Sequence, residues 1–139
     1  MKLKIFLLTL LLMFMCSGSY AADIVLITDK SNSVDKISAT DAKNIFLGKK
    51  KRWDDGSIII PIVQKDQKVA DQFNKTIVKK TSSQFDLFWR KAVFTGTGAP
   101  PTEVEDNDAM KKMVTSKTGA IGYITADALD DTVKKVEVQ

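Results

Sequence analysis

The sequence contains no histidine, and this absence removes several kinds of active site. Without an imidazole there is no Ser-His-Asp triad, no histidine metal ligand and no side chain whose ordinary pKa lies near neutral pH. A serine–lysine pair or two carboxylates would remain available, but no spacing of these residues singles out such a site. We therefore predict a protein that is not an enzyme and that holds neither a metal ion nor a cofactor.

Cysteine is nearly absent too, since Cys16 is the single one. It lies in an N-terminal segment in which two lysines precede an apolar run over 5–15, which is typical of a secretory signal peptide. The run is shorter than the roughly 20 residues that a membrane-spanning helix needs. We predict a signal peptide over 1–21, with cleavage before Ala22 or Asp23.

Lipid attachment at Cys16 is disfavoured because the bulky Met15 stands where a lipoprotein peptidase site has a small residue. The mature chain would then have no thiol, which excludes disulfides and cysteine-based sites. These features predict a periplasmic or secreted bacterial protein without stable membrane insertion after signal cleavage.

The excess of basic over acidic residues is also small. The formal net charge of +4 comes from 21 basic and 17 acidic residues, and loss of Lys2 and Lys4 leaves 19 minus 17, or +2. Such a balance argues against a nucleic-acid partner. The remaining length, 22–139, suits a single domain with one core.

Apolar patterning predicts strands that alternate with helices. Short apolar or alternating runs indicate strands over 23–28, 58–63, 119–124 and 133–138. Helical spacing of apolar residues indicates helices over 38–47, 67–80, 82–93 and 106–115, and glycine and proline indicate a loop over 94–101. This order is typical of a layered α/β domain.

Several phrases of the sequence occur together in a known family. They are Ile45–Lys49 (IFLGK), Trp53–Gly56 (WDDG) leading to Ile60–Ile62, the aromatic residues Phe73, Phe88 and Trp89, and Gly119–Tyr123 (GAIGY). In these the chain resembles the periplasmic phosphate-binding proteins of phosphate ABC transporters. The resemblance implies an α/β fold, one lobe of a type II periplasmic binding protein, with a mixed, mostly parallel sheet flanked by helices. Members of that family are more than twice as long and close two lobes around phosphate, whereas this chain has residues for one.

The turn after Val63 is the first candidate ligand site. Ligands of open α/β sheets bind beyond the carboxyl ends of strands, and anions favour helix N-termini. The candidate ligand-binding residues of this turn are Gln64, Lys65, Gln67 and Lys68. The family has an arginine and a Ser-Gly-Thr here, which this chain lacks, and Asp66 would repel a dianion. The alternative is a solvated turn that binds nothing.

Two other stretches carry candidate residues. Thr95 and Thr97 belong to a glycine-containing loop that would assist the first site with hydroxyls and backbone amides, or would be an ordinary turn. The basic run Lys49, Lys50, Lys51 and Arg52, with an exposed Trp53 beside it, is a candidate partner surface, with a solvated charge run as the alternative.

Two hypotheses follow from these features. The first is an exported solute-binding-protein-like module that binds phosphate or another small oxyanion weakly. The second is a protein-interaction module of the cell envelope that has kept the lobe and lost its ligand site.

Overall fold

A computed structural model describes residues 23–139, so the predicted signal peptide and Cys16 lie outside the described residues. The strands are β1 (Ile24–Thr28), β2 (Lys36–Ile37), β3 (Ile60–Gln64), β4 (Thr102–Val104), β5 (Ala120–Thr125) and β6 (Lys134–Val138). The helices are α2 (Ala39–Phe46), α3 (Gln67–Phe73), α4 (Ser82–Phe94) and α5 (Asn107–Ser116), with a π-helical turn η1 (Asn74–Val78) and a 3-10 turn η2 (Ala126–Ala128). Within 23–139 no helix has the length and apolar character to cross a bilayer.

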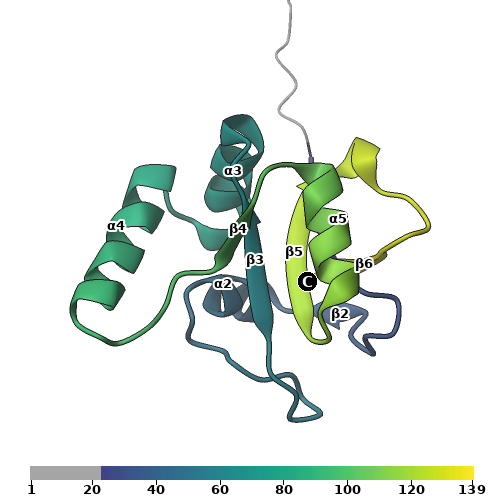
Figure 1. The fold of residues 1–139 in the computed structure, drawn as a ribbon, viewed down its shortest axis with the longest axis horizontal. Coiled ribbons are helices and arrows are strands. Elements are labelled where there is room, and N and C mark those ends of the chain that lie inside the picture. The colour runs from purple at the N-terminus through teal and green to yellow at the C-terminus, as the bar shows by residue number, and fades with distance from the viewer. Residues whose placement is uncertain (1–22) are drawn as a thin grey trace, which may run out of the picture.

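The strands form one sheet of six, in the order β2-β6-β1-β5-β3-β4. β3 pairs in parallel with both β4 and β5, and β2 with β6, whereas β1 is antiparallel to its two neighbours. The predicted mixed, mostly parallel sheet with flanking helices is therefore confirmed. Because β3, β4 and β5 point the same way, their carboxyl ends share one edge, at the top of Figure 1, where α3 and α5 begin.

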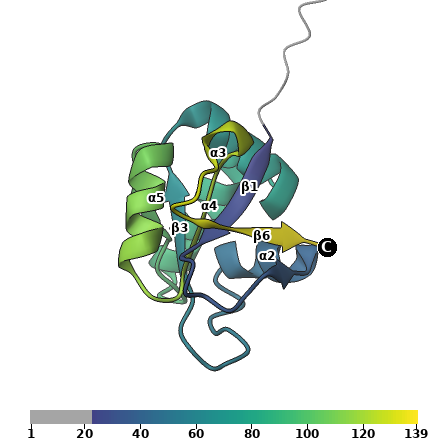
Figure 2. The same ribbon diagram turned by 90° about the vertical axis from the view of Figure 1, so that its right-hand side faces the viewer.

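Helices cover both faces of the sheet. Figure 2 shows α5 on one side of the strands and α2 on the other. Successive side chains of a strand point to opposite faces, and β5 illustrates this: Tyr123 packs with the α2 side, and Ile124 with the α5 side. Both layers thus depend on the same strands.

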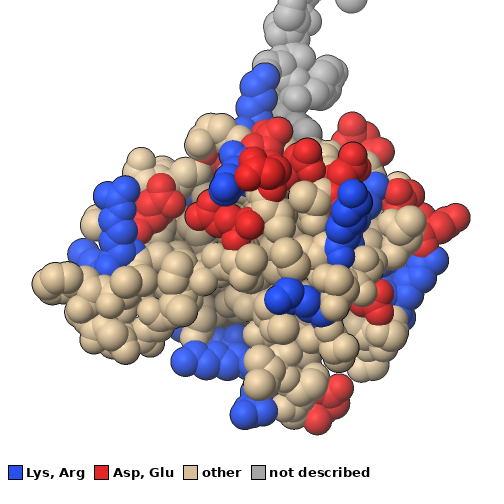
Figure 3. Space-filling view, in the orientation of Figure 1, with Lys and Arg blue, Asp and Glu red and all other residues tan. Residues whose placement is uncertain are grey.

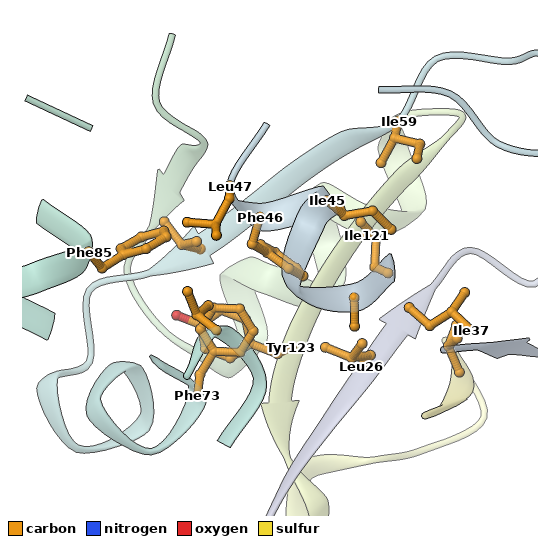
Figure 4. Packing of buried hydrophobic residues seen from close by; sticks show 14 of the residues in the cluster. Leu26, Ile37, Ile45, Phe46, Leu47, Ile59, Phe73, Phe85, Ile121 and Tyr123 are labelled. Atoms are coloured by element: carbon orange, nitrogen blue, oxygen red, sulfur yellow. The ribbon is translucent and has the colours of Figure 1, made fainter. Parts of the chain in front are cut away.

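An aromatic cluster forms the centre of the α2 layer (Figure 4). The ring of Phe73 stacks on Tyr123 at a centroid distance of 3.7 Å, and Phe46 meets Phe73 edge-on at 4.7 Å. Such ring contacts contribute about 0.5–1.5 kcal/mol of stabilisation beyond that from the burial of the ring surfaces. The cluster holds α2 and α3 against β5.

The GAIGY phrase needs its first glycine for geometric reasons. Gly119 has a φ of +85°, and a Cβ there would lie 2.2 Å from the carbonyl oxygen of Ile58. The close approach lets the Trp53 indole Nε1–H donate to the Gly119 carbonyl at 3.1 Å. The turn before β5 is thereby tied to the segment before β3.

Two details differ from the sequence-based expectation. The helix expected over 67–80 is an α-helix only to Phe73, continues as the π-helical turn, and ends at Lys79 with a φ of 60°. The strands β2 and β4 were not expected, because two or three residues carry too little pattern to be recognised.

Candidate functional site

Gln64 ends β3 at the shared carboxyl edge; its backbone N–H and its Nε2 are hydrogen-bonded inside the protein, whereas its Oε1 has no partner among the described residues. The side chain is buried, with 3% of its surface exposed. Its Nε2 donates to Asn107 Oδ1 at 3.1 Å and to the Tyr123 carbonyl at 3.0 Å. Its backbone N–H donates to the Tyr123 hydroxyl at 3.1 Å. Gln64 therefore ties β3, β5 and α5 together.

Of the other predicted residues of this turn, Lys65 and Gln67 are each paired with an acidic side chain. Lys65 Nζ pairs with Glu105 Oε1 at 3.0 Å, which raises the pKa of Lys65. Gln67 donates to Asp71 Oδ1 at 2.6 Å. Lys68 is exposed and pairs with no carboxylate of the described chain.

The N-terminus of α3 is already occupied by a carboxylate. Asp66 accepts a hydrogen bond from the Val69 backbone N–H at 3.3 Å and so caps the helix. Glu103, Glu105 and Asp106 stand nearby in the sequence of β4 and the start of α5, and acidic side chains gather at this edge in Figure 3. A dianion would meet repulsion there. Binding at Gln64–Lys68 stays a prediction, with this charge distribution against it.

A small hollow of about 240 Å³ lies between β3, α3 and the first turn of α4. Its polar lining includes the Tyr123 hydroxyl and the side chain of Asn74. Asn74 is 4% exposed, and its Oδ1 has no hydrogen-bond partner within residues 23–139. Burial raises the pKa of Tyr123, so its hydroxyl keeps its proton over the physiological range. The residues that line the hollow therefore include one buried donor, the Tyr123 hydroxyl, and two buried acceptors without a partner in the described chain, Asn74 Oδ1 and Gln64 Oε1.

Thr95 and Thr97 are not part of this site. They follow the C-terminal end of α4, a helix of 13 residues and thus about 20 Å long, whose N-terminal end lines the hollow. Thr95 Oγ1 donates to the Lys91 carbonyl at 2.8 Å, and the two hydroxyls are 3.1 Å apart. They close the helix end, where the dipole is negative and disfavours anions. The structure thus does not bring Thr95 and Thr97 together with the turn after Val63, contrary to the expectation from the sequence.

The predicted partner surface lacks one of its residues, because Trp53 is buried. The indole is 5% exposed and donates to Gly119, so the expectation of an exposed ring is wrong. Lys50 is held by Asp41 at 3.0 Å and by Asp54 at 3.6 Å.

The other basic residues of the run remain outside the core. Lys49, Lys51 and Arg52 are exposed, and the Arg52 guanidinium donates to the Gly56 carbonyl at 2.8 Å. The run therefore presents charge without the exposed Trp53 ring that the sequence predicted beside it.

A basic hollow that the sequence reading missed lies at the N-terminus of α4. Its volume is about 770 Å³, and it is lined by Gln67, Asp71, Lys75, Lys79, Lys80, Thr81, Ser82, Ser83 and Gln84. The three lysines form no ion pair with any carboxylate of the described residues, and three lysines minus one aspartate leave the lining with +2.

The helix start in this hollow has unused donors. Thr81 and Gln84 form a reciprocal capping box, with Gln84 N–H to Thr81 Oγ1 at 3.1 Å. The backbone N–H groups of Ser82 and Ser83 precede the first intrahelical bond, as first-turn amides do. The signal in the sequence was the phrase Lys79–Ser83 (KKTSS), in which two lysines stand directly before a helix cap.

Comparison with known proteins gives structural neighbours of one kind, while no family model matches the sequence. An ABC-type phosphate transport receptor from Vibrio cholerae superposes with a TM-score of 0.59 at 18% identity, over 84% of this chain and 46% of its own. A putative phosphate ABC transporter substrate-binding protein with bound phosphate from Clostridium perfringens gives 0.58 at 25% identity, over 84% and 45%. PstS from Borrelia burgdorferi gives 0.64 at 13% identity, over 85% and 47%.

The chain thus spans less than half the length of each of these proteins. This agrees with the single lobe that the sequence resemblance implied. The described chain is therefore similar in fold to part of the substrate-binding proteins of phosphate ABC transporters.

Proposed function

We propose that the protein is an exported, non-catalytic binding module that binds phosphate or a similar small oxyanion weakly in the basic hollow at the N-terminus of α4. The observation that carries the proposal is the meeting of Lys75, Lys79 and Lys80 with the free first-turn amides of α4. Unpaired ammonium groups and helix amides are both favourable partners of an anion. The neighbour from Clostridium perfringens holds phosphate, which supports an oxyanion as the ligand class.

Charge distinguishes this hollow from the turn after Val63. At that turn Lys65 is paired with Glu105, and Asp66 occupies the helix N-terminus. At the start of α4 the cap is a neutral threonine, and the one carboxylate of the lining, Asp71, accepts a hydrogen bond from the Ser82 hydroxyl at 2.5 Å and is outnumbered by three lysines. A single open lobe contacts a small ligand from one side, so the affinity should be low.

Thermal unfolding of the chain without its predicted signal peptide tests the proposal. We expect a saturable rise in Tm with phosphate that exceeds the rise with chloride at matched ionic strength, with sulfate as a second oxyanion. Occupancy at 100 times Kd would add about 2.7 kcal/mol to the free energy of unfolding. The K79A/K80A double variant should lose the rise.

Two matched double variants locate the site. K65A/K68A removes the same charge from the predicted turn, and K49A/K51A removes it from the basic run; both should keep the rise. Loss in K65A/K68A alone would place the anion at the turn after Val63. An equal rise with all three salts would contradict oxyanion binding.

The cell-envelope interaction module is the second candidate function, and exposed apolar side chains favour it. Phe94 is 93% exposed, Val93 55% and Leu87 50%, all on α4. Large apolar groups that gather on a surface often mark a protein contact. Delivery to the bacterial periplasm is part of both proposals, and cell fractionation of the full chain tests it.

A further inference from the structure

An apolar groove runs between α4 and the segment that leads into β4. Its volume is about 540 Å³, and its lining includes Phe85 and Trp89, both 7% exposed, together with Pro100 and Pro101. Phe94, at the C-terminal end of α4, also lines it and stands almost fully in solvent. Figure 3 shows an uncharged surface at the lower left, over this end of α4.

The groove continues into the small hollow beneath the β3 edge. Val63, Phe85, Asp86 and Glu103 line both spaces, so the two are adjacent. The labelled close-up shows the Tyr123 hydroxyl on the side of its ring that faces Phe85 (Figure 4). The apolar groove thus opens at one end into the polar small hollow.

Two carboxylates mark the junction of groove and hollow. Neither Asp86 nor Glu103 forms an ion pair with another residue of the 23–139 region, and both are exposed. Arg90 also lines the groove, so two acids and one base leave its lining at −1. Beyond the junction, the buried Asn74 Oδ1 lacks a hydrogen-bond donor among the described residues. Carboxylates and a carbonyl-type oxygen all accept hydrogen bonds. Lys65 and the Tyr123 hydroxyl are donors in the hollow's lining, and the acceptors without a partner at this end favour a ligand that brings a further donor.

We propose that the groove binds an extended peptide segment of a partner protein in which a lysine or arginine stands beside two or more apolar residues. The apolar residues would cover Trp89, Val93 and Phe94. The basic side chain would pack its alkyl stem on Phe85 and place its charge between Asp86 and Glu103. The charge of the groove is opposite to that of the basic hollow, so this inference is independent of oxyanion binding.

A fluorescently labelled decapeptide with a central Leu-Val-Lys-Phe, titrated with the chain lacking its predicted signal peptide, tests the proposal. We expect saturable binding that weakens at least about tenfold when Lys is replaced by Glu, because hydrogen bonds to charged groups contribute about 1.5–3 kcal/mol. The nearly isosteric D86N/E103Q variant should weaken binding of the Lys peptide similarly. Amide chemical-shift changes should map to residues 85–94 and 101–104.

Three controls keep the test decisive. D127N/D131N removes two exposed carboxylates elsewhere on the surface and should leave peptide binding unchanged. K79A/K80A should also leave it unchanged, which separates this result from the fate of phosphate binding. Equal Tm values for wild type and D86N/E103Q would show that the fold is intact.

Three outcomes would overturn the inference. One is no saturable binding of the Lys peptide. Another is equal binding of the Lys and Glu peptides. The third is n-octylammonium binding as tightly as the peptide, which would make the groove a small-molecule site.

Discussion

Tyr123 connects the core to the candidate site through one side chain. Its ring stacks on Phe73, with an angle of 6° between the planes, and its hydroxyl accepts the backbone N–H of Gln64. The hydroxyl is carried from the aromatic cluster to the carboxyl edge of the sheet. A buried group in this position affects both stability and its dependence on pH.

We expect the stability of the protein to fall as pH rises above about 10, the ordinary pKa of tyrosine. Burial raises the pKa of Tyr123 in the folded state. Below pH 10 both states keep the proton, and above it the unfolded state ionises first and is favoured. Y123F should be less stable at neutral pH by about 1–3 kcal/mol, because the Gln64 N–H loses its acceptor.

Urea unfolding of wild type and Y123F between pH 7 and 11 measures this effect. Lysines titrate in both proteins, so the difference between the two pH profiles isolates Tyr123. Because Tyr20 lies in the predicted signal peptide, tyrosinate absorbance of the mature chain reports Tyr123 alone. Parallel profiles would show that Tyr123 ionises in the folded state as it does in water.

Single-residue environments were the hardest feature to predict from sequence. Trp53 follows four basic residues and reads as exposed, yet its partner is the carbonyl of Gly119, 66 positions away. Gln64 was expected in the turn after a strand and is instead the last residue of β3, and its contact with Asn107 depends on α5 packing beside that strand. Local pattern carries no information on such distant contacts.

At the scale of elements, periodicity predicted most helices and strands. The helix expected over 67–80 differs from the structure, and the basic hollow forms where it differs. The spacing of apolar residues over 67–80 continues through the π-helical turn, so it indicated one helix. In the structure Lys79 takes a left-handed conformation, which ends the turn and brings Lys75, Lys79 and Lys80 together at α4. That hollow therefore depends on a chain reversal that a helical pattern does not show.

Gly119→Ala should destabilise the start of β5 more than Gly56→Ala destabilises the turn before β3. Both glycines have positive φ, +85° and +88°, so each substitution adds the strain of a left-handed conformation, about 1–2 kcal/mol. Only at Gly119 would the new Cβ meet the Ile58 carbonyl, at 2.2 Å, whereas nothing lies within 4 Å at Gly56. Chemical unfolding of both variants gives the two costs, and equal losses would show that the backbone at Gly119 relaxes freely.

At the scale of the whole molecule, the sequence predicted the class of fold, because buried strands and capped helices have strong local patterns. The structural neighbours confirm that fold over less than half of their own length. Where a ligand would bind was not predictable in the same way, since the family's phosphate-binding phrase is missing from the turn after Val63. The charges that distinguish the basic hollow from the apolar groove, whose lining carries −1, come from residues of different elements, which meet only in the folded chain.

Both layers of the molecule should unfold in one transition, because they pack on opposite faces of the same strands. Ile45 belongs to the α2 layer and Ile124 to the α5 layer, and each is at most 1% exposed. I45V and I124V should each lower the free energy of unfolding by about 0.5–1.5 kcal/mol.

Trp53 and Trp89 both lie in the α2 layer, so their fluorescence reports that layer, whereas far-ultraviolet circular dichroism reports the whole fold. If the sheet couples the layers, the two signals will coincide in wild type and in both variants, as a two-state transition requires. A shift of the dichroism curve alone in I124V would mean that the α5 layer unfolds independently. In that event the carboxyl edge, where α5 meets Gln64 through Asn107, would be able to open while the basic hollow on the other face stays formed.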